Sequence, residues 1–384
     1  MSTVCTPSLY AQAHLELVAR SAHLAQDVLA VEALIDDAFI KRGSMLRVAR
    51  TTPIRFDAVR TYAQENFARE LIEQLKALWR IVYGAIQKLW QRIVDFIRVE
   101  VIHLYTLNKR KLEALKRRVA TSTPAQYRDK PYETTRLIAA FPTTSSVAYD
   151  AMLTRVNAHI KESFALYDLN TIRAIIDSAA FKAAHATKDY YREDAHKPIP
   201  LDSIEESLNA LYTHIATLLG CSTERVQSAK NFTGVSQYVL HGDRRAVYEA
   251  HFSEVDADAL LGWRTPSSQV NTQVIEPFSN TVHLQELLKS LNELNELNAG
   301  ILKPFRELNA MMNQTNTHVQ KSFDALASVT DETFESTATQ YRLYLTLCSK
   351  TLTGLLEYVK SLTVYNSAMV RSGCFYVESL FVNP

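Results

Sequence analysis

Apolar residues recur at helical spacing along most of this 384-residue chain, and the longest such run lies between Pro53 and Ala120. Its apolar positions fall three or four residues apart, which is the period of one face of an α-helix, and polar residues occupy the other face. Thr52 and Pro53 can serve as the N-cap and the first helical residue. The run therefore predicts one long amphipathic helix. Its apolar positions are Leu71, Ile72, Leu75, Leu78, Trp79, Val82, Tyr83, Ile86, Leu89, Trp90, Ile93, Phe96 and Ile97.

A straight helix over this run would be unusually long. At 1.5 Å per residue it would extend for about 100 Å, which a globular core seldom needs. Gly84 also weakens the helix by roughly 1 kcal/mol relative to alanine. We therefore expect a bend near Gly84 or around Leu104–Asn108.

Further helices are predicted on both sides of the long run from capping residues, periodic apolar positions and stop signals. They cover Thr6 to Gly43, 146–195, 202–220, 281–299, 304–329 and 331–371. Residues 220–282 contain four of the nine glycines, and there we expect short helices and loops. The end of the chain, 374–381, is predicted as a short strand or as an apolar tail docked on the helices.

These elements predict an all-α protein, in which long amphipathic helices pack as an elongated multi-helix bundle with a less regular segment near 220–282. Nine glycines and eleven prolines are few for this length, which argues against tight hairpins and Gly-rich nucleotide loops. Three prolines with Thr and Ser around them mark a linker. The predicted divisions are an N-terminal helix (1–50), a basic helix (51–122), the linker (123–145), a helical body with loops (146–280) and a C-terminal bundle of long helices (281–384).

Positive charge is concentrated on the long helix. Between Lys76 and Arg118 there are eleven basic residues and three acidic ones, a net charge of +8, whereas the whole chain carries +1. The rest of the chain therefore carries −7. Either this face pairs with acidic helices of the same protein, or it binds an anionic polymer or membrane surface. The basic residues are Lys76, Arg80, Lys88, Arg92, Arg98, Lys109, Arg110, Lys111, Lys116, Arg117 and Arg118.

Trp79 and Trp90 lie eleven residues apart on similar sides of the basic helix. Tryptophan beside Arg and Lys can stack on bases or lie at a membrane interface. The alternative is that both rings belong to the core, which is the commoner role of aromatic residues at helical spacing. Both are kept as candidate interface aromatic residues.

Catalytic signatures are lacking from the sequence. It contains no P-loop, no GxGxxG, no GxSxG and no HExxH motif. His185, Asp189, Glu193 and His196 would share one face of a helix and could bind a first-row metal, but a charged, solvated helix end explains the cluster without a metal and is the preferred interpretation. His241 to Arg245 form a polar turn that we expect to cap a helix. We predict no catalytic residues, no metal and no cofactor.

Four scattered cysteines, Cys5, Cys221, Cys348 and Cys374, show no CxxC spacing. They predict reduced thiols rather than a zinc site or a disulfide framework. The N-terminus lacks a secretory signal pattern, and no uncharged apolar stretch is long enough to span a bilayer. The expected protein is soluble and intracellular.

The segment from Leu75 to Ile97, rich in Trp, Phe, Lys and Arg, together with the charged stretch Asn108 to Arg118, resembles internal virion structural proteins of giant tailed bacteriophages. The resemblance covers about residues 60–120 and the helical layout of the remainder. It implies a non-enzymatic protein packaged with the genome inside the capsid and present in the host cytoplasm during assembly. Its implied partners are other virion proteins, double-stranded DNA bound without sequence preference, and further copies of the chain.

Three functional hypotheses follow from the sequence. The first is a phage virion structural protein whose basic helix, 76–118, packs against DNA or partner virion proteins. The second is a membrane-active helical protein, such as a pore-forming or ejected channel component, in which Trp79 and Trp90 enter an interface. The third, ranked last, is an enzyme with its site at 185–196.

Overall fold

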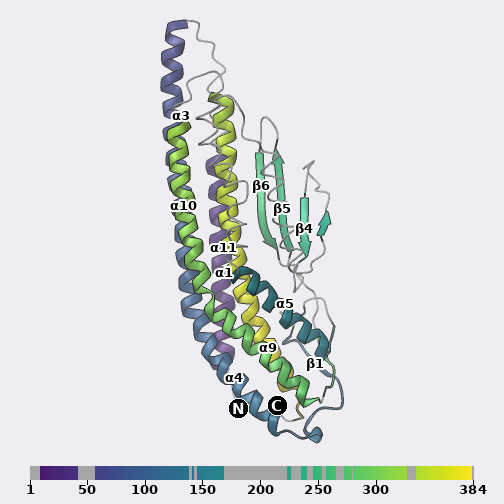
Figure 1. Cartoon of the computed structure of the whole chain (residues 1–384). Helices are drawn as coiled ribbons and strands as arrows, with labels where there is room; N and C mark the ends of the chain where they lie inside the picture. The colour runs from purple at the N-terminus through teal and green to yellow at the C-terminus, as the bar shows by residue number, and fades with distance from the viewer. Residues whose placement is uncertain are drawn as a thin grey trace, which may run out of the picture.

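The computed structural model describes residues 9–41, 57–137, 141, 145–167, 223–225, 235–239, 245–252, 257–264, 272–278, 280–326 and 334–382. These residues are mostly helical, as the all-α prediction requires. Long helices run side by side and form an elongated body, with a small β-sheet along one side of its upper half (Figure 1).

Seven α-helices lie within the described residues. In chain order they are α1 (Leu9–Ile35), α3 (Asp57–Phe96), α4 (Ile102–Thr121), α5 (Tyr149–Tyr167), α9 (Thr281–Gly300), α10 (Leu302–Leu326) and α11 (Phe334–Ser379). A π-helical turn, η1 (Asp36–Lys41), continues α1, and a second one, η2 (Ile97–Val101), joins α3 to α4. The predicted helices at 6–43, 53–120, 281–299, 304–329 and 331–371 correspond to these elements, whereas the one at 202–220 and the later part of 146–195 lie outside the described residues.

The long basic helix is continuous through Gly84 and through Leu104–Asn108, where a bend was expected. The irregularity lies at η2 instead, and the helical rod changes direction on passing from α3 to α4 (Figure 1). A π turn holds one more residue than an α turn and is a common cause of helix kinks. Here it brings Glu100 into a buried position, where the carboxylate pairs with Arg20 of α1 at 2.8 Å.

Helix α11 is the centre of the molecule. It packs against α1, α3, α4, α5, α9 and α10 and against the strand β6 (Ala257–Arg264). Its buried residues include many small polar ones, among them Ser349, Thr353, Thr363 and Ser367. Each of these hydroxyls donates a hydrogen bond to the carbonyl four residues earlier, at 2.7–3.1 Å. Their polar groups are therefore satisfied within the helix, and neighbouring helices can pack closely over them.

The lower half of the body has one continuous apolar core. It is formed by α4, α5, α9 and the last turns of α11, together with residues of the predicted linker. From that linker Tyr127, Leu137 and Phe141 are buried in this core. Tyr127 also pairs with Phe381 through an isolated β-bridge, and their rings stack 4.8 Å apart. The stretch 374–381 thus docks on the helices, as one alternative predicted, but it does so mostly as the helical end of α11.

A small three-stranded sheet closes the same end of the molecule. Its strands are β1 (Tyr132–Thr134), β2 (Ser146–Val147) and β7 (Gln273–Ile275), with β7 in the centre, antiparallel to β1 and parallel to β2. β7 immediately precedes α9, whose first N–H groups are capped by the Asn280 side chain. The sheet therefore ties the start of α9 to the loop that follows α4.

The prediction of short helices and loops for 220–282 is wrong for β7 and for four further segments in it. These four are the strands β3 (Thr223–Arg225), β4 (Val235–Val239), β5 (Arg245–Phe252) and β6 (Ala257–Arg264), which form one antiparallel sheet in sequence order. β5 and β6 pair along their full eight-residue lengths, from Arg245 opposite Arg264 to Phe252 opposite Ala257. β5 and β6 are equally long and only four residues separate them, so they can pair along their whole length. This pairing outweighed the local helix signals on which the prediction rested.

Three helices distant in sequence, α1, α4 and α9, are linked by a buried polar network. The Tyr10 hydroxyl donates to Asn108 Oδ1 at 2.9 Å, and Asn108 Nδ2 donates to Asn295 Oδ1 at 3.1 Å. His14 lies beside them, 2% exposed, in ring contact with Tyr10. Burial and the positive charge of Arg371 lower the pKa of His14 to about 3. The network joins α1, α4 and α9 and fixes their relative register.

Two glycines provide a matched test of helix packing. A Cβ at Gly373 of α11 would lie 2.6 Å from Cδ1 and 3.0 Å from Cγ of the fully buried Leu291, whereas a Cβ at Gly84 of α3 would meet nothing within 4 Å. We expect Gly373→Ala to lower the free energy of unfolding by about 1–3 kcal/mol through overpacking. Gly84→Ala should raise it by up to about 1 kcal/mol through helix propensity. Urea unfolding followed by circular dichroism measures both, and a Gly373→Ala protein as stable as wild type would contradict the close approach of α9 and α11.

His14 predicts a pH dependence of stability. Its pKa is lowered in the folded state, so its contribution to stability is complete above pH 6.5, the ordinary histidine value, and is lost as the pH falls towards about 3. The unfolding free energy of wild type relative to His14→Gln should therefore fall by about 1 kcal/mol per pH unit between pH 6 and 4. Urea titrations at several pH values measure it. The substitution His23→Gln, at an exposed position of the same helix, is the control, and equal pH profiles for wild type and His14→Gln would contradict the prediction.

Candidate functional site: a basic helical edge

The apolar face of the long helix is used within the molecule. Seven α3 residues, spaced three or four apart, are at most 4% exposed and face α1, α10 and α11. This burial fixes the rotation of the helix, so the polar face and its basic residues must point outward. The seven are Ile72, Leu75, Trp79, Val82, Ile86, Leu89 and Ile93.

Four of the eleven basic residues form ion pairs within the protein. Lys76 pairs with Glu73 on its own helix, Nζ to Oε1 3.2 Å. The other three reach other helices, which is the pairing with acidic helices that the charge imbalance suggested. They are Arg92 with Asp27 of α1, Lys109 with Glu296 of α9, and Lys111 with Glu378 of α11.

Two further contacts lie at the lower end of the basic helix. The guanidinium of Arg118 lies over the Phe381 ring, 4.1 Å from its centroid, which is the geometry of a cation–π contact. Lys109 lies next to the Tyr105 hydroxyl and Glu296, and both raise the pKa of its ammonium group. These residues anchor α4 to the rest of the body. They are poor candidates for contacts with an external ligand.

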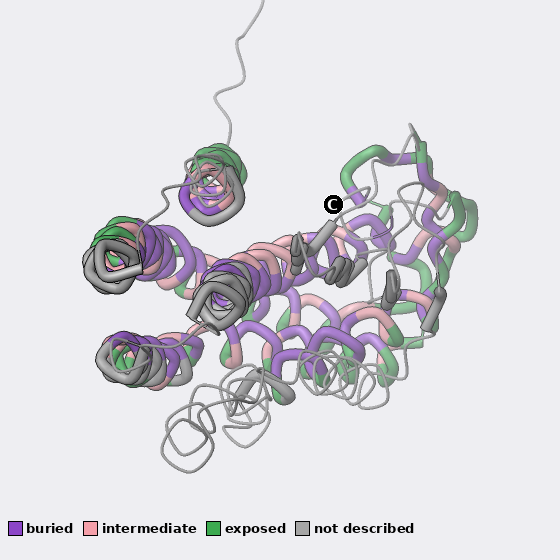
Figure 2. Tube along the Cα trace, turned by 90° about the horizontal axis from the view of Figure 1, so that it is seen from above, coloured by how far each residue is buried: buried purple, intermediate pink, exposed green. Residues whose placement is uncertain are grey.

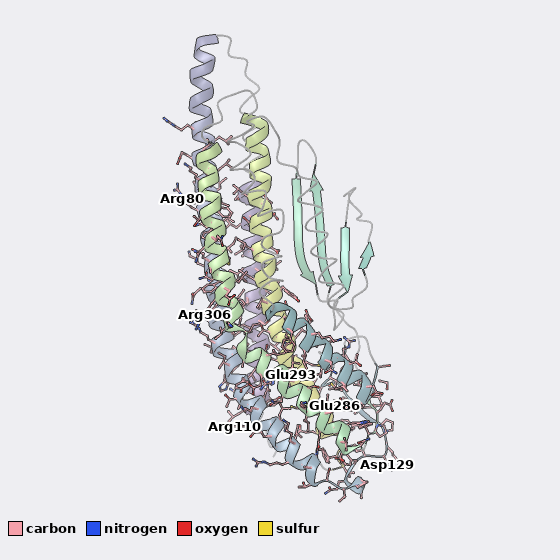
Figure 3. All side chains as sticks on the ribbon, viewed as in Figure 1. Arg80, Arg110, Asp129, Glu286, Glu293 and Arg306 are labelled. Atoms are coloured by element: carbon pink, nitrogen blue, oxygen red, sulfur yellow. The ribbon has the colours of Figure 1, made fainter. Side chains whose placement is uncertain are left out.

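The remaining six basic residues have no ion-pair partner within the part of the chain that the structure describes. Five of them are exposed and Lys116 is half-buried. Arg80 and Arg98 are separated by 18 residues, or five turns of an α-helix, and so lie on about the same side of it. In Figure 3 Arg80 and Arg110 both project from the same long edge of the molecule. The six residues, named here the basic edge, are Arg80, Lys88, Arg98, Arg110, Lys116 and Arg117.

The tertiary structure adds a residue that sequence reasoning missed. Arg306 of α10 is exposed and lies between Arg80 and Arg110 along this edge in Figure 3. It is placed there because α10 packs against α3, with hydrogen bonds from Trp79 Nε1 to Asn316 Oδ1 at 2.8 Å and from the Tyr83 hydroxyl to Asn313 Oδ1 at 3.0 Å. Only a predicted pairing of α3 with α10 could have pointed to it.

Several acidic side chains lie away from the basic edge, although Asp95 of α3 and Glu113 of α4 are exposed on the same helices as its residues. Glu286 and Glu293 of α9 and Asp129 of the loop after α4 are found on the opposite side of α4 from Arg110 in Figure 3. The charges are therefore partly separated, with basic side chains in excess of acidic ones between Lys76 and Arg118. A separated charge distribution produces a positive potential along one edge, even though the net charge is only +1.

The two candidate interface tryptophans differ in their environments. Trp79 is fully buried, stacks on Tyr83 at 5.7 Å and donates its indole N–H to Asn316. Trp90 is half-buried, and its indole nitrogen is buried without a hydrogen-bond acceptor in the described structure. In this arrangement the Trp79 ring belongs to the core, and it could stack on a base only if α3 and α10 separated.

The other candidate metal-binding and polar residues lie partly outside the described residues. His185, Asp189, Glu193 and His196 lie outside the described residues, so the metal hypothesis for them stays untested. Arg245 begins β5, so the expected helix after the polar turn at 241–245 is a strand instead. Among the described residues no group of three His, Cys, Asp or Glu side chains is placed to hold a metal. Cys374 is a free, buried thiol whose pKa is raised to about 12, chiefly by burial.

Comparison with family profiles, with curated protein sequences and with solved structures yields no match to this chain. The resemblance to internal virion proteins therefore remains a hypothesis that rests on the residues quoted for it. Within the described residues, no helix combines the length and apolarity needed to cross a membrane.

The burial of Trp79 predicts a large effect on stability. Trp79→Ala removes a fully buried indole and its hydrogen bond to Asn316, and should lower the unfolding free energy by about 3–5 kcal/mol. Ile81→Ala, at a position 53% exposed on the same helix, should change it by no more than about 0.5 kcal/mol. Urea midpoints measure both variants. If Trp79→Ala were as stable as Ile81→Ala, the tryptophan would not be a core residue.

Proposed function

We propose that the protein is a non-enzymatic structural protein that binds double-stranded DNA, without sequence preference, along the basic edge. The observation that carries the proposal is the division of the basic residues into two sets. One set makes contacts within the protein, and the other has no ion-pair partner among the described residues, with Arg80 and Arg110 projecting from one edge (Figure 3). The resemblance to internal virion proteins suggests that the DNA is a packaged phage genome and that the protein lies in the capsid interior with other virion proteins.

The dimensions of the basic edge suit a polymer better than a small anion. From Arg80 to Arg117 the helical rod extends for roughly 55 Å at 1.5 Å per residue. One turn of duplex DNA is about 34–36 Å long, so the edge spans more than one turn. Basic side chains spread over this length can reach phosphates of a rod-like polyanion, whereas a single phosphate or nucleotide would contact one or two of them.

The chemistry of the edge favours backbone contacts over base reading. Arg and Lys side chains on the surface of a bundle can neutralise phosphates, and such contacts position a protein without reading sequence. Trp79, the aromatic residue best placed by sequence to stack on bases, is in the core. Intact duplex, with its bases stacked inside, is therefore the preferred ligand over single strands.

The membrane-active alternative ranks second. It requires the wide apolar face of α3 to meet lipid, but that face is buried against α1, α10 and α11. Insertion would thus need the bundle to open first. The enzyme hypothesis rests on residues 185–196, to which the described structure adds nothing.

Salt dependence tests the proposal. If about five residues of the basic edge contact phosphates, the logarithm of the affinity for a duplex of mixed sequence should fall with the logarithm of salt concentration at a slope near −4.5. Neutralising three of them in Arg80→Gln/Lys88→Gln/Arg98→Gln should make the slope shallower by about 2.7 and weaken binding equally for unrelated sequences. Fluorescence anisotropy of a labelled duplex with the full-length chain measures both.

The matched control removes the same charge from elsewhere. Lys130, Lys161 and Lys289 are exposed and lie outside α3 and α4, so Lys130→Gln/Lys161→Gln/Lys289→Gln should keep the wild-type slope. Absent binding at low salt, salt-independent binding, or equal loss in both variants would refute the DNA-binding role. Leakage of anionic vesicles by the wild-type protein would instead support the membrane-active alternative.

A further inference from the structure

Helix α1 is apolar on two sides, but the described residues of the other elements cover only one of them. Its buried side packs against α3 and α11 and includes Leu17, Leu24 and Val28. On another side Leu15 and Leu29 remain 60% and 63% exposed. Seen along the bundle in Figure 2, α1 stands at the margin of the helices with its exposed residues turned away from them.

The uncovered side of α1 is a continuous stripe of small and aliphatic residues. The positions three, four, seven and eleven residues before and after Ala22 fall on the same helix face as Ala22. Seven of these eight positions carry Ala, Val or Leu, and the eighth is Gln26. Six of the eight are exposed, and the other two, Ala11 and Ala25, are half-buried. The stripe consists of Ala11, Leu15, Val18, Ala19, Ala22, Ala25, Gln26, Leu29 and Ala33.

The stripe reads almost the same in both directions from Ala22. Ala19 mirrors Ala25, Leu15 mirrors Leu29, and Ala11 mirrors Ala33. A two-fold symmetric interface requires one surface patch to be complementary to itself, so that residue i meets residue j and j meets i. When two such helices cross antiparallel at Ala22, each Leu15 faces the partner's Leu29, each Val18 faces the partner's Gln26, and alanine faces alanine at the remaining positions of the stripe.

We propose that the protein forms a homodimer through an antiparallel pair of α1 helices, with the two-fold axis at Ala22. A second copy of the chain is the occupant to which the mirror symmetry of the stripe points, because an unrelated partner would not require it. The dimer interface is separate from the basic edge, which lies on α3 and α4, so it does not depend on DNA binding.

The geometry of such a pair is favourable. Helix axes lie 8–10 Å apart in packed pairs, and alanine at the crossing allows the lower end of this range. The stripe from Ala11 to Ala33 is about 33 Å long, and its leucines stand seven residues from the crossing on either side. A stripe of this size is at the small end of specific interfaces, so we expect a dimer that dissociates on dilution.

Sedimentation velocity over a range of concentrations tests the dimer in the full-length protein. We expect wild type to sediment as a dimer at the higher concentrations and Leu15→Glu/Leu29→Glu to sediment as a monomer, with unchanged helix content by circular dichroism. Val282→Glu places the same charge at another exposed apolar position, 70% exposed at the start of α9, and should remain dimeric. A wild-type protein that is monomeric throughout, or a dimer that survives the double substitution, overturns the proposal.

Cysteine cross-linking tests the register independently of stability. Position 22 meets itself across the two-fold axis, so Ala22→Cys should form a disulfide-linked dimer on mild oxidation, since facing Cα atoms of packed helices come within about 6 Å. Ala30 is exposed on the same helix but beside the stripe, and its two copies would be roughly 24 Å apart along the axis. Ala30→Cys should therefore give no linked dimer beyond that of the native cysteines. Equal cross-linking of the two variants, or none with Ala22→Cys, overturns the antiparallel pairing.

Discussion

None of the described residues of helix α11 from Leu352 to Ser379 is exposed, so the helix can be stable only if other elements cover it on all sides. Its buried Ser and Thr hydroxyls bond to its own carbonyls, which removes the need for polar partners from outside. The rest of the fold follows from this requirement. α1, α3, α4, α5, α9, α10 and the strand β6 pack against it. Each covering helix turns its apolar face to α11 and thereby fixes which of its residues reach the surface.

The burial of one face of each helix also determines which charged side chains reach the surface. Because α3 must bury the side that carries Trp79, its arginines and lysines face outward. Some of them meet acids on neighbouring helices, as Arg92 meets Asp27 of α1 and Lys111 meets Glu378 of α11. The others are left along one edge, and Arg306 joins them because α10 packs beside α3. The same reasoning applies to α1. Only one of its two apolar sides is needed to cover its neighbours, and the other is available to a second molecule.

Much of the architecture could be predicted from local patterns. The long helices were found from apolar residues at a spacing of three and four, because this period reflects one buried face whatever the partner is. The four strands between Thr223 and Arg264 were missed, since their stability comes from pairing with one another and not from a helical or alternating pattern strong enough to read alone. The segment around Tyr127, read as a linker from its prolines, contributes to a core whose other members are distant in sequence. For the candidate site, the sequence identified the eleven basic residues but could not separate paired from unpaired ones.

The sequence by itself determined that the protein is built mainly of long helices and that its positive charge is gathered on one of them. These are properties of residue type and spacing along a single helix. Only the tertiary structure decided which side of each helix is buried, which basic residues find acidic partners, and which apolar stripe is left uncovered. The physical reason is that an ion pair or a buried face depends on residues brought together from separate parts of the chain, as Asp27 is brought to Arg92 and Asn316 to Trp79.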